Sequence, residues 1–142
     1  MKISARNAFP GTITAVRDGA VNAEIELSLS HGDKLVAIVT EGSAQSLGLA
    51  VGQSATAFVK APWVVLLEPN SGLKFSARNH LHGEVVQVSN GAVNSEVSVK
   101  LRSGTLVHAV VTNDAVQDMG LKAGVPIDVL IKASHILIGV PA

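Results

Sequence analysis

The sequence contains no cysteine and no tyrosine, and its aromatic residues amount to three phenylalanines and one tryptophan in 142 residues. Without cysteine the chain cannot form disulfides, thiolate metal sites or a cysteine nucleophile. Charged residues make up only 15%, and the 11 basic and 11 acidic side chains balance. A neutral chain with few aromatic side chains lacks the basic groove and the stacking platforms typical of single-stranded nucleic-acid binding. We therefore expect no nucleic-acid partner.

Long apolar runs are also missing. The longest, residues 61–67, is interrupted by Pro62 and is far too short to cross a bilayer. The first residues carry charge but no apolar segment of a secretory signal. We therefore expect a cytoplasmic protein with no membrane partner. Hydrophobic residues nevertheless make up 47% of the chain, which is enough for a packed core.

The sequence repeats itself. A displacement of 72 positions aligns the two halves without a gap, and 22 of the 63 positions from 4 to 66 are then identical. Residues 4–7, Ser-Ala-Arg-Asn, recur at 76–79, and Gly-Ala-Val-Asn occurs in both copies. Between the copies lies a stretch rich in residues that break regular structure, Glu-Pro-Asn-Ser-Gly. We predict two modules, residues 1–68 and 73–142, joined by a linker at 69–72.

Each copy is predicted to be mostly β-strand. Apolar and polar residues alternate over 22–30 and again over 93–102, as in a strand with one buried face. Asp-Gly and Asn-Gly pairs before these segments indicate tight hairpins. Residues 35–39 are apolar throughout, which predicts burial of both faces. One short helix is predicted in each copy, over 43–49 and 115–119, with Asp114 as the N-cap of the second.

About five strands and one helix in about 65 residues predict an all-β fold: two tandem OB-like five-stranded Greek-key barrels, each with one short helix. A unit this small buries only about 60% of its unfolded surface and is marginally stable alone. We therefore expect the two copies to pack against each other, and chains to associate as a symmetric oligomer.

An ordered set of elements recurs at matching spacing in both halves: residues 4–7, Gly11, the strand 37–40, residues 48–49 and residues 60–61. This set resembles the Mop family, the molbindins. The resemblance implies molybdate-binding modules with an OB-like barrel, six of which assemble, so that a two-module chain would form a homotrimer. It further implies storage or buffering of molybdate or tungstate, with no enzymatic activity and no catalytic cofactor.

The resemblance also implies that the anion lies at interfaces between modules. A tetrahedral dianion loses its hydration on binding, so cations and hydrogen-bond donors must replace the water. An arginine and a lysine match its charge, and hydroxyls supply further donors. Carried over residue by residue, the oxyanion-binding residues are Ser4, Arg6, Thr40, Ser43, Lys60 and Ala61 in the first copy and Ser76, Arg78, Thr112, Lys132 and Ala133 in the second.

The copies differ within this set. Ser43 is replaced by Ala115 in the second copy, which removes one donor, so we expect sites of unequal kinds. The repeated Gly-Ala-Val-Asn turn, with Asn22 and Asn94, is the candidate for a second kind of site on a symmetry axis.

Other interpretations stay open. The hydroxyls of Ser4 and Thr40 could satisfy nearby backbone groups instead of a ligand. The arginines and lysines could pair with Glu24 and Glu26 in a purely structural oligomer, and a single-stranded nucleic-acid-binding OB module is a further alternative. No helix-turn-helix and no phosphate-cradling glycine loop accompanies the modules, so we expect no fused regulator or ATPase in this chain.

The histidines favour no repeated role. His80 and His82 lie two residues apart and would share one face of a strand, as metal ligands do. Their first-copy counterparts are Ala8 and Pro10, and no third ligand is evident in the sequence. We therefore expect no direct protein–metal bonds.

Overall fold

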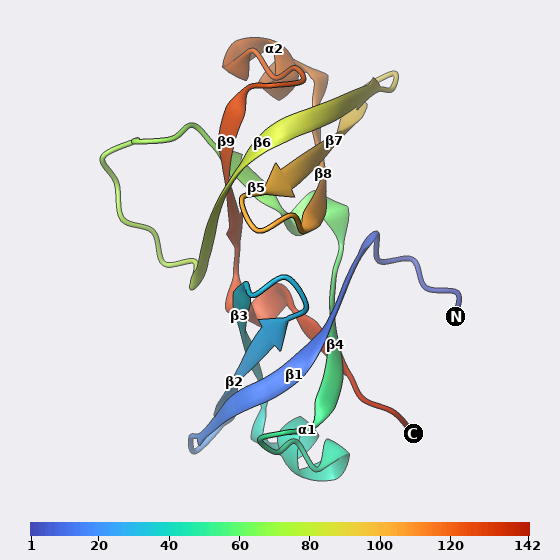
Figure 1. Ribbon diagram of the computed structural model, residues 1–142, viewed down its shortest axis with the longest axis vertical. Helices are drawn as coiled ribbons and strands as arrows, with labels where there is room; N and C mark the ends of the chain where they lie inside the picture. Colours follow the sequence, from blue (N-terminus) through green and yellow to red (C-terminus); the bar gives the residue numbers. More distant parts are fainter.

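The computed structural model describes all residues, 1–142, and consists of two similar halves stacked along the long axis of the molecule, with α1 and α2 at opposite ends (Figure 1). The first repeat contains β1 (Asn7–Asp18), β2 (Asn22–Leu29), β3 (Lys34–Thr40), α1 (Glu41–Leu47), β4 (Ser54–Val59), the 3-10 turn η1 (Ala61–Trp63) and β5 (Val65–Leu67). The second contains β6 (Asn79–Asn90), β7 (Asn94–Leu101), β8 (Leu106–Thr112), α2 (Asn113–Met119), β9 (Pro126–Ile131), the 3-10 turn η2 (Ala133–His135) and β10 (Leu137–Gly139). No helix has the length and apolar character needed to span a membrane.

Each half contains a five-stranded sheet whose fifth strand comes from the other repeat. The strand orders are β10-β4-β1-β2-β3 and β5-β9-β6-β7-β8. All the strand pairs are antiparallel, and the order β4-β1-β2-β3 is that of a Greek key. The predicted fold class, two OB-like five-stranded units each with one short helix, is confirmed. The exchange of the fifth strands is a feature that the sequence pattern does not reveal.

The alternating segments form strands with one buried face, as predicted. In β2 the buried side chains are Ala23, Ile25, Leu27 and Leu29, and in β7 every second side chain is likewise buried. Gly11 in β1 lies against β2 so closely that a Cβ atom there would meet the carbonyl oxygen of Ser28 at 2.5 Å. Its counterpart Gly83 makes the same close approach, so both glycines are required by strand spacing.

The two helices begin two residues earlier than predicted. Thr40 and Thr112 are extended in backbone conformation, and each side-chain oxygen accepts a hydrogen bond from the backbone N–H three residues on. These threonines are therefore the N-caps. The prediction that Asp114 caps α2 was wrong, because Asp114 lies in the first turn, where its charge complements the helix dipole. Both helices end at a left-handed glycine, Gly48 or Gly120.

One continuous cluster of 27 buried hydrophobic residues draws on both repeats. The prediction that residues 35–39 are buried on both faces holds only in part. Leu35 and Ala37 are fully buried, and Val39 on the same face is half-buried against the core, whereas Val36 and Ile38 on the outer face are only half-buried.

Two buried asparagines join the halves. Asn7 Nδ2 donates to the backbone oxygen of His108 at 2.8 Å and to that of Val59 at 3.2 Å, and its Oδ1 accepts from the His108 N–H at 2.7 Å. Asn79 forms the equivalent pair of bonds with the backbone of Val36, both at 2.8 Å. Each amide therefore continues the backbone ladder of the opposite repeat, and neither role was anticipated from the sequence.

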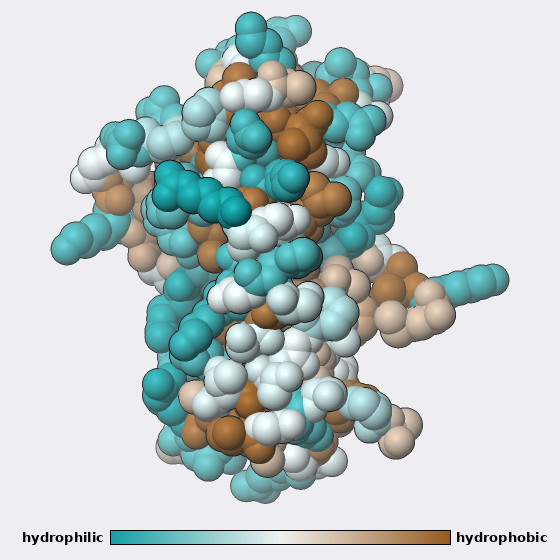
Figure 2. Space-filling view, viewed as in Figure 1, coloured by the Kyte–Doolittle hydropathy of each residue, from teal (hydrophilic) through white to brown (hydrophobic).

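The surface is mixed in polarity. Figure 2 shows hydrophilic side chains over most of the visible face, interrupted by hydrophobic patches near both ends of the molecule. Several large apolar side chains are exposed, among them Trp63, Val65 and Leu137.

Candidate functional site

The two repeated arginines cross from one repeat to the other. Arg6 Nη2 lies 2.8 Å from Glu96 Oε1 on β7, and Arg78 Nη1 forms an ion pair with Glu24 on β2. Both arginine side chains are exposed, with accessible fractions of 58% for Arg6 and 50% for Arg78. Each arginine therefore lies on the surface of the repeat to which it does not belong.

Glu24 is held in its charged form by these contacts. The hydrogen bond from Arg78 lowers the pKa of this carboxyl below its ordinary value, and Arg17, which lies 2.8 Å away, acts in the same direction. Partial burial opposes the shift without reversing it. In the structure the arginines thus pair with glutamates, as one of the alternative interpretations supposed. Glu26 pairs with Lys34, and neither Lys60 nor Lys132 forms an ion pair.

Asn22 and Thr40 lie on the same sheet face as Glu24, one row of paired residues further along the strands. Glu24 pairs with Ile38, and Asn22 pairs with Thr40 one row further toward α1. Alternate residues of a strand share a face and lie roughly 7 Å apart. Glu24, the partner of Arg78, is therefore one row away from Asn22 and Thr40. Glu96, the partner of Arg6, is likewise one row away from the pair Asn94 and Thr112.

The structure places each arginine on the other copy. Arg6 and Arg78 contact Glu96 and Glu24, because the N-terminal end of each first strand runs onto the opposite repeat. The two candidate site types are also neighbours, since Asn22 is directly paired with Thr40, and Asn94 with Thr112.

The hydroxyls at the helix starts are already engaged. Thr40 Oγ1 accepts from the Ser43 N–H at 3.0 Å, and its hydroxyl donates to Ser43 Oγ at 2.7 Å. Thr112 accepts only from the Ala115 N–H, at 3.1 Å. The Ser43 hydroxyl thus completes a small donor cluster in the first repeat that Ala115 cannot provide in the second.

The predicted lysines and the alanines that follow them lie where the two repeats meet. Lys60 and Lys132 are exposed and directly precede η1 and η2, which contact β8 and β3 of the opposite repeats. Trp63 and His135 in these turns stack with ring centroids 4.9 Å apart. Ala61 and Ala133 are fully buried, so only their backbone can face a ligand.

Two of the predicted residues share a pocket. A cavity of about 270 Å³ contains Ser76 and Lys132 together with Trp63 and Phe75. Most of its lining is apolar. Ser4 and Ser76 are both exposed and lie two residues before the arginines, where the structure gives their hydroxyls no partner.

The family model described as the TOBE domain matches residues 3–66 and 76–138, which together are most of the chain. The chain belongs to the TOBE domain family. Its two matched segments correspond to the two repeats of the sequence.

Relatives of this tandem TOBE chain are described as molybdenum proteins. Molybdenum-pterin-binding protein MopA of Rhodobacter capsulatus is 40% identical over 141 residues, covering 99% of this chain and 53% of MopA. Molybdenum transport protein ModE of Azotobacter vinelandii is 41% identical over 140 residues, covering 99% of this chain and 52% of ModE. The chain thus spans about half the length of these curated relatives.

A solved structure matches the tandem TOBE chain over its whole length. It is described as the cytoplasmic molybdate-binding protein ModG in a form with molybdate bound. It is 52% identical, with a TM-score of 0.95, and the match covers 99% of this chain and 100% of the ModG chain.

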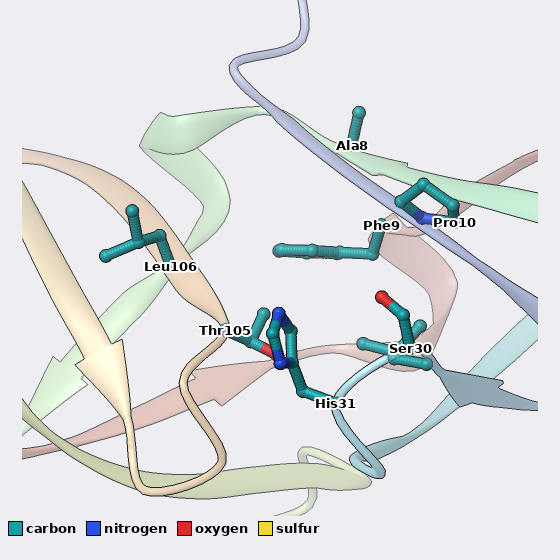
Figure 3. Close-up of a pocket in the computed structure, with 8 residues that line it drawn as sticks. Ala8, Phe9, Pro10, Ser30, His31, Thr105 and Leu106 are labelled. Atoms are coloured by element: carbon teal, nitrogen blue, oxygen red, sulfur yellow. The ribbon is translucent and has the colours of Figure 1, made fainter.

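A further pocket between the TOBE repeats is a poor anion site. It has a volume of about 180 Å³, and Figure 3 shows Ser30 and His31 of the first repeat facing Thr105 and Leu106 of the second. The carboxylate of Asp33 accepts a hydrogen bond from Thr105 at 2.8 Å beside it. Because a carboxylate repels a dianion, this pocket serves the contact between the repeats rather than anion binding.

Proposed function

We propose that this chain is a cytoplasmic molybdate-binding protein that stores or buffers the anion without chemically changing it. The observation that carries the proposal is the likeness to ModG, whose structure contains molybdate and which this chain matches over its whole length at 52% identity. Membership of the TOBE family and the likeness to MopA support the same ligand class. Tungstate, a tetrahedral dianion of the same charge, is expected to bind as well.

The proposed sites are composite. Arg78 of the second repeat, together with Thr40 and Ser43 of the first, supplies a guanidinium fork and hydroxyl donors. Arg6 and Thr112 form the equivalent set, without a serine. Further donors are proposed from the remaining predicted residues: Ser4, Lys60 and Ala61 in the first repeat and Ser76, Lys132 and Ala133 in the second.

Anion binding requires each arginine to exchange its glutamate for the ligand. The pairs are exposed, and exposed ion pairs contribute little because both charges stay solvated. A dianion that also contacts a lysine and hydroxyls can therefore compete with Glu24 or Glu96 for the guanidinium. Asn22 and Asn94 are proposed to line a second kind of site, close to the first.

We also propose that the chain consists of modules 1–68 and 73–142 joined by the linker 69–72, and that it forms a homotrimer. In one chain the lysines lie near the contact between the repeats, whereas the capping threonines lie toward the ends beside α1 and α2. A second copy that supplied the missing side of each site would complete it. Exposed apolar residues such as Val65 and Leu137 supply surface for such contacts.

The experiment that tests the proposal is elemental mass analysis of the purified protein, followed by titration of the emptied protein with molybdate and with sulfate. We expect bound molybdenum, saturable molybdate binding and much weaker sulfate binding, because the smaller sulfate tetrahedron leaves donors unfilled. Trp63 lies in the same pocket as Lys132, so its fluorescence is a convenient readout. Equal affinity for the two anions would contradict a specific molybdate site.

One observation favours a second candidate, a purely structural oligomer: both repeated arginines are paired with glutamates. In that case the protein would show no saturable molybdate binding, and removal of the arginines would lower the stability of the assembly. The same titration separates the two functions.

A further inference from the structure

A compact group of metal-ligand side chains occurs in the second repeat, on strands β6 and β9, and includes none of the residues of the arginine–glutamate pairs. His80 Nε2 lies 2.8 Å from Asp128 Oδ2, and His82 Nδ1 lies 2.7 Å from Asp128 Oδ1. The three potential ligand atoms all lie within 4.8 Å of one another. The spacing of the two histidines is visible in the sequence, but the carboxylate is not, because it lies 46 positions from His82.

Strand pairing produces this arrangement. His80 and His82 alternate on one face of β6, and Asp128 on β9 is the direct cross-strand partner of His82. Both strands are internal to the sheet, so the backbone that holds the three side chains is paired on both sides. The ring of Phe75 packs edge-on against His80, with centroids 6.5 Å apart, and restricts that imidazole further. The ligand geometry is therefore built into the sheet.

The carboxylate is buried but charged. The Asp128 side chain is only 7% exposed, and this burial alone would raise its pKa, yet hydrogen bonds with His80 and His82 bring the pKa below its ordinary value. The two imidazoles remain accessible, at 38% and 50%. The group thus combines a buried carboxylate oxygen from Asp128 with two imidazole nitrogens that solvent can reach.

We propose that His80, His82 and Asp128 bind a divalent transition-metal ion such as Zn²⁺. Two imidazoles and one carboxylate are a typical zinc ligand set, and three protein ligands leave a coordination position for water or a small anion. Such ligands bind at about 2.0–2.2 Å from the metal. Because the three ligand atoms already lie within 4.8 Å of one another, small side-chain movements bring them to these distances around one ion. The ion takes the place of the protons that now join the imidazoles to the carboxylate.

The site belongs to one repeat only. The first-repeat counterparts of the three residues are Ala8, Pro10 and Thr56, none of which is a ligand of this kind. We therefore expect one ion per chain, whereas the proposed anion sites occur in both repeats. The expectation of no protein–metal bonds depended on the lack of a third ligand, and Asp128 supplies that ligand.

The test is titration of the metal-free full-length protein with Zn²⁺ by calorimetry and with Co²⁺ by visible absorption. We expect one ion per chain, and a Co²⁺ spectrum characteristic of low coordination number. His80→Ala combined with His82→Ala should abolish binding, and Asp128→Asn should weaken it at least tenfold. His31→Asn, which removes a histidine outside the group, is the matched control and should bind normally.

Molybdate titration of the same variants separates this proposal from the anion proposal, because the two sites share no residue. Loss of Zn²⁺ binding with unchanged molybdate binding supports an independent metal site. Absence of Zn²⁺ binding by the unsubstituted protein, more than one equivalent ion per chain, or undiminished binding by the doubly substituted protein would overturn it.

Discussion

Arg6 and Glu96 form an ion pair of 2.8 Å between residues 90 positions apart in the chain, one in each repeat. Arg78 and Glu24 form the equivalent ion pair in the opposite direction, from the second repeat to the first. The repeats therefore exchange not only their fifth strands but also these arginine–glutamate ion pairs. Under the proposed function, an anion site on one repeat would depend on the arginine of the other.

Glu96→Gln should raise the affinity for molybdate. The neutral amide competes less strongly for the Arg6 guanidinium and repels the dianion less, so the gain should be up to about 1 kcal/mol, roughly fivefold in Kd. Calorimetric titration measures the change. Glu84→Gln, which removes an exposed carboxylate elsewhere on the same repeat, is the matched control. Weaker binding by Glu96→Gln would mean that this carboxylate assists the site instead of competing with the ligand.

A double-mutant cycle should detect the regrouping of residues between repeats. Arg78→Ala and Ser43→Ala are expected to be coupled by about 0.5–3 kcal/mol in molybdate binding, because both groups serve the same site. Arg6→Ala and Ser43→Ala should be additive to within about 0.5 kcal/mol. The affinities of the single and double variants provide both values. The opposite pattern of coupling would place Ser43 with the arginine of its own repeat.

Asn79→Ala should lower the free energy of unfolding by about 3 kcal/mol, because the part-buried backbone N–H and carbonyl of Val36 and the buried carbonyl of Ile131 lose their hydrogen bonds to the amide. Denaturant unfolding measures this loss. Gln45→Ala, at an exposed helix position, should change stability by less than about 0.5 kcal/mol. An Asn79→Ala variant as stable as Gln45→Ala would show that the amide does not hold the repeats together.

Ile138→Ala tests the strand exchange. Ile138 is buried in the sheet of the first repeat, so its truncation should cost about 2–5 kcal/mol and expose the amides of β4 to hydrogen exchange. The neighbouring Leu137 is 61% exposed, and Leu137→Ala should have little effect. Faster exchange confined to β9, in the second repeat, would be incompatible with the observed pairing.

The sequence predicted the strands well, because the alternation in β2 and β7 leaves only one register that buries the apolar face. It could not predict the exchange of fifth strands. The segments Val65–Leu67 and Leu137–Gly139 occupy equivalent positions in the two repeats, and each has the same exposed–buried–half-buried pattern, so the local pattern does not tell which sheet either strand joins. Their partners depend on the path of the chain through η1 and η2, which local pattern does not encode.

The same limit applies to the candidate sites. Comparison of the repeats singled out Arg6 and Arg78, because they recur, and the resemblance placed the sites between modules, but neither showed which residues of the opposite copy each arginine contacts. It passed over Asp128, because residue 56 in the first copy is a threonine. It also gave no sign that Asn7 and Asn79 bind the opposite backbone, since an amide in a strand is ambiguous until its neighbour is known.

The central claim, that anion binding depends on arginines exchanged between repeats, is tested most directly by calorimetric titration of molybdate into the unsubstituted protein and into Arg6→Ala combined with Arg78→Ala. Size-exclusion chromatography should show that the oligomer persists in the double variant. We predict saturable binding by the unsubstituted protein and loss of most binding by the double variant. Undiminished binding by an intact double variant would contradict it.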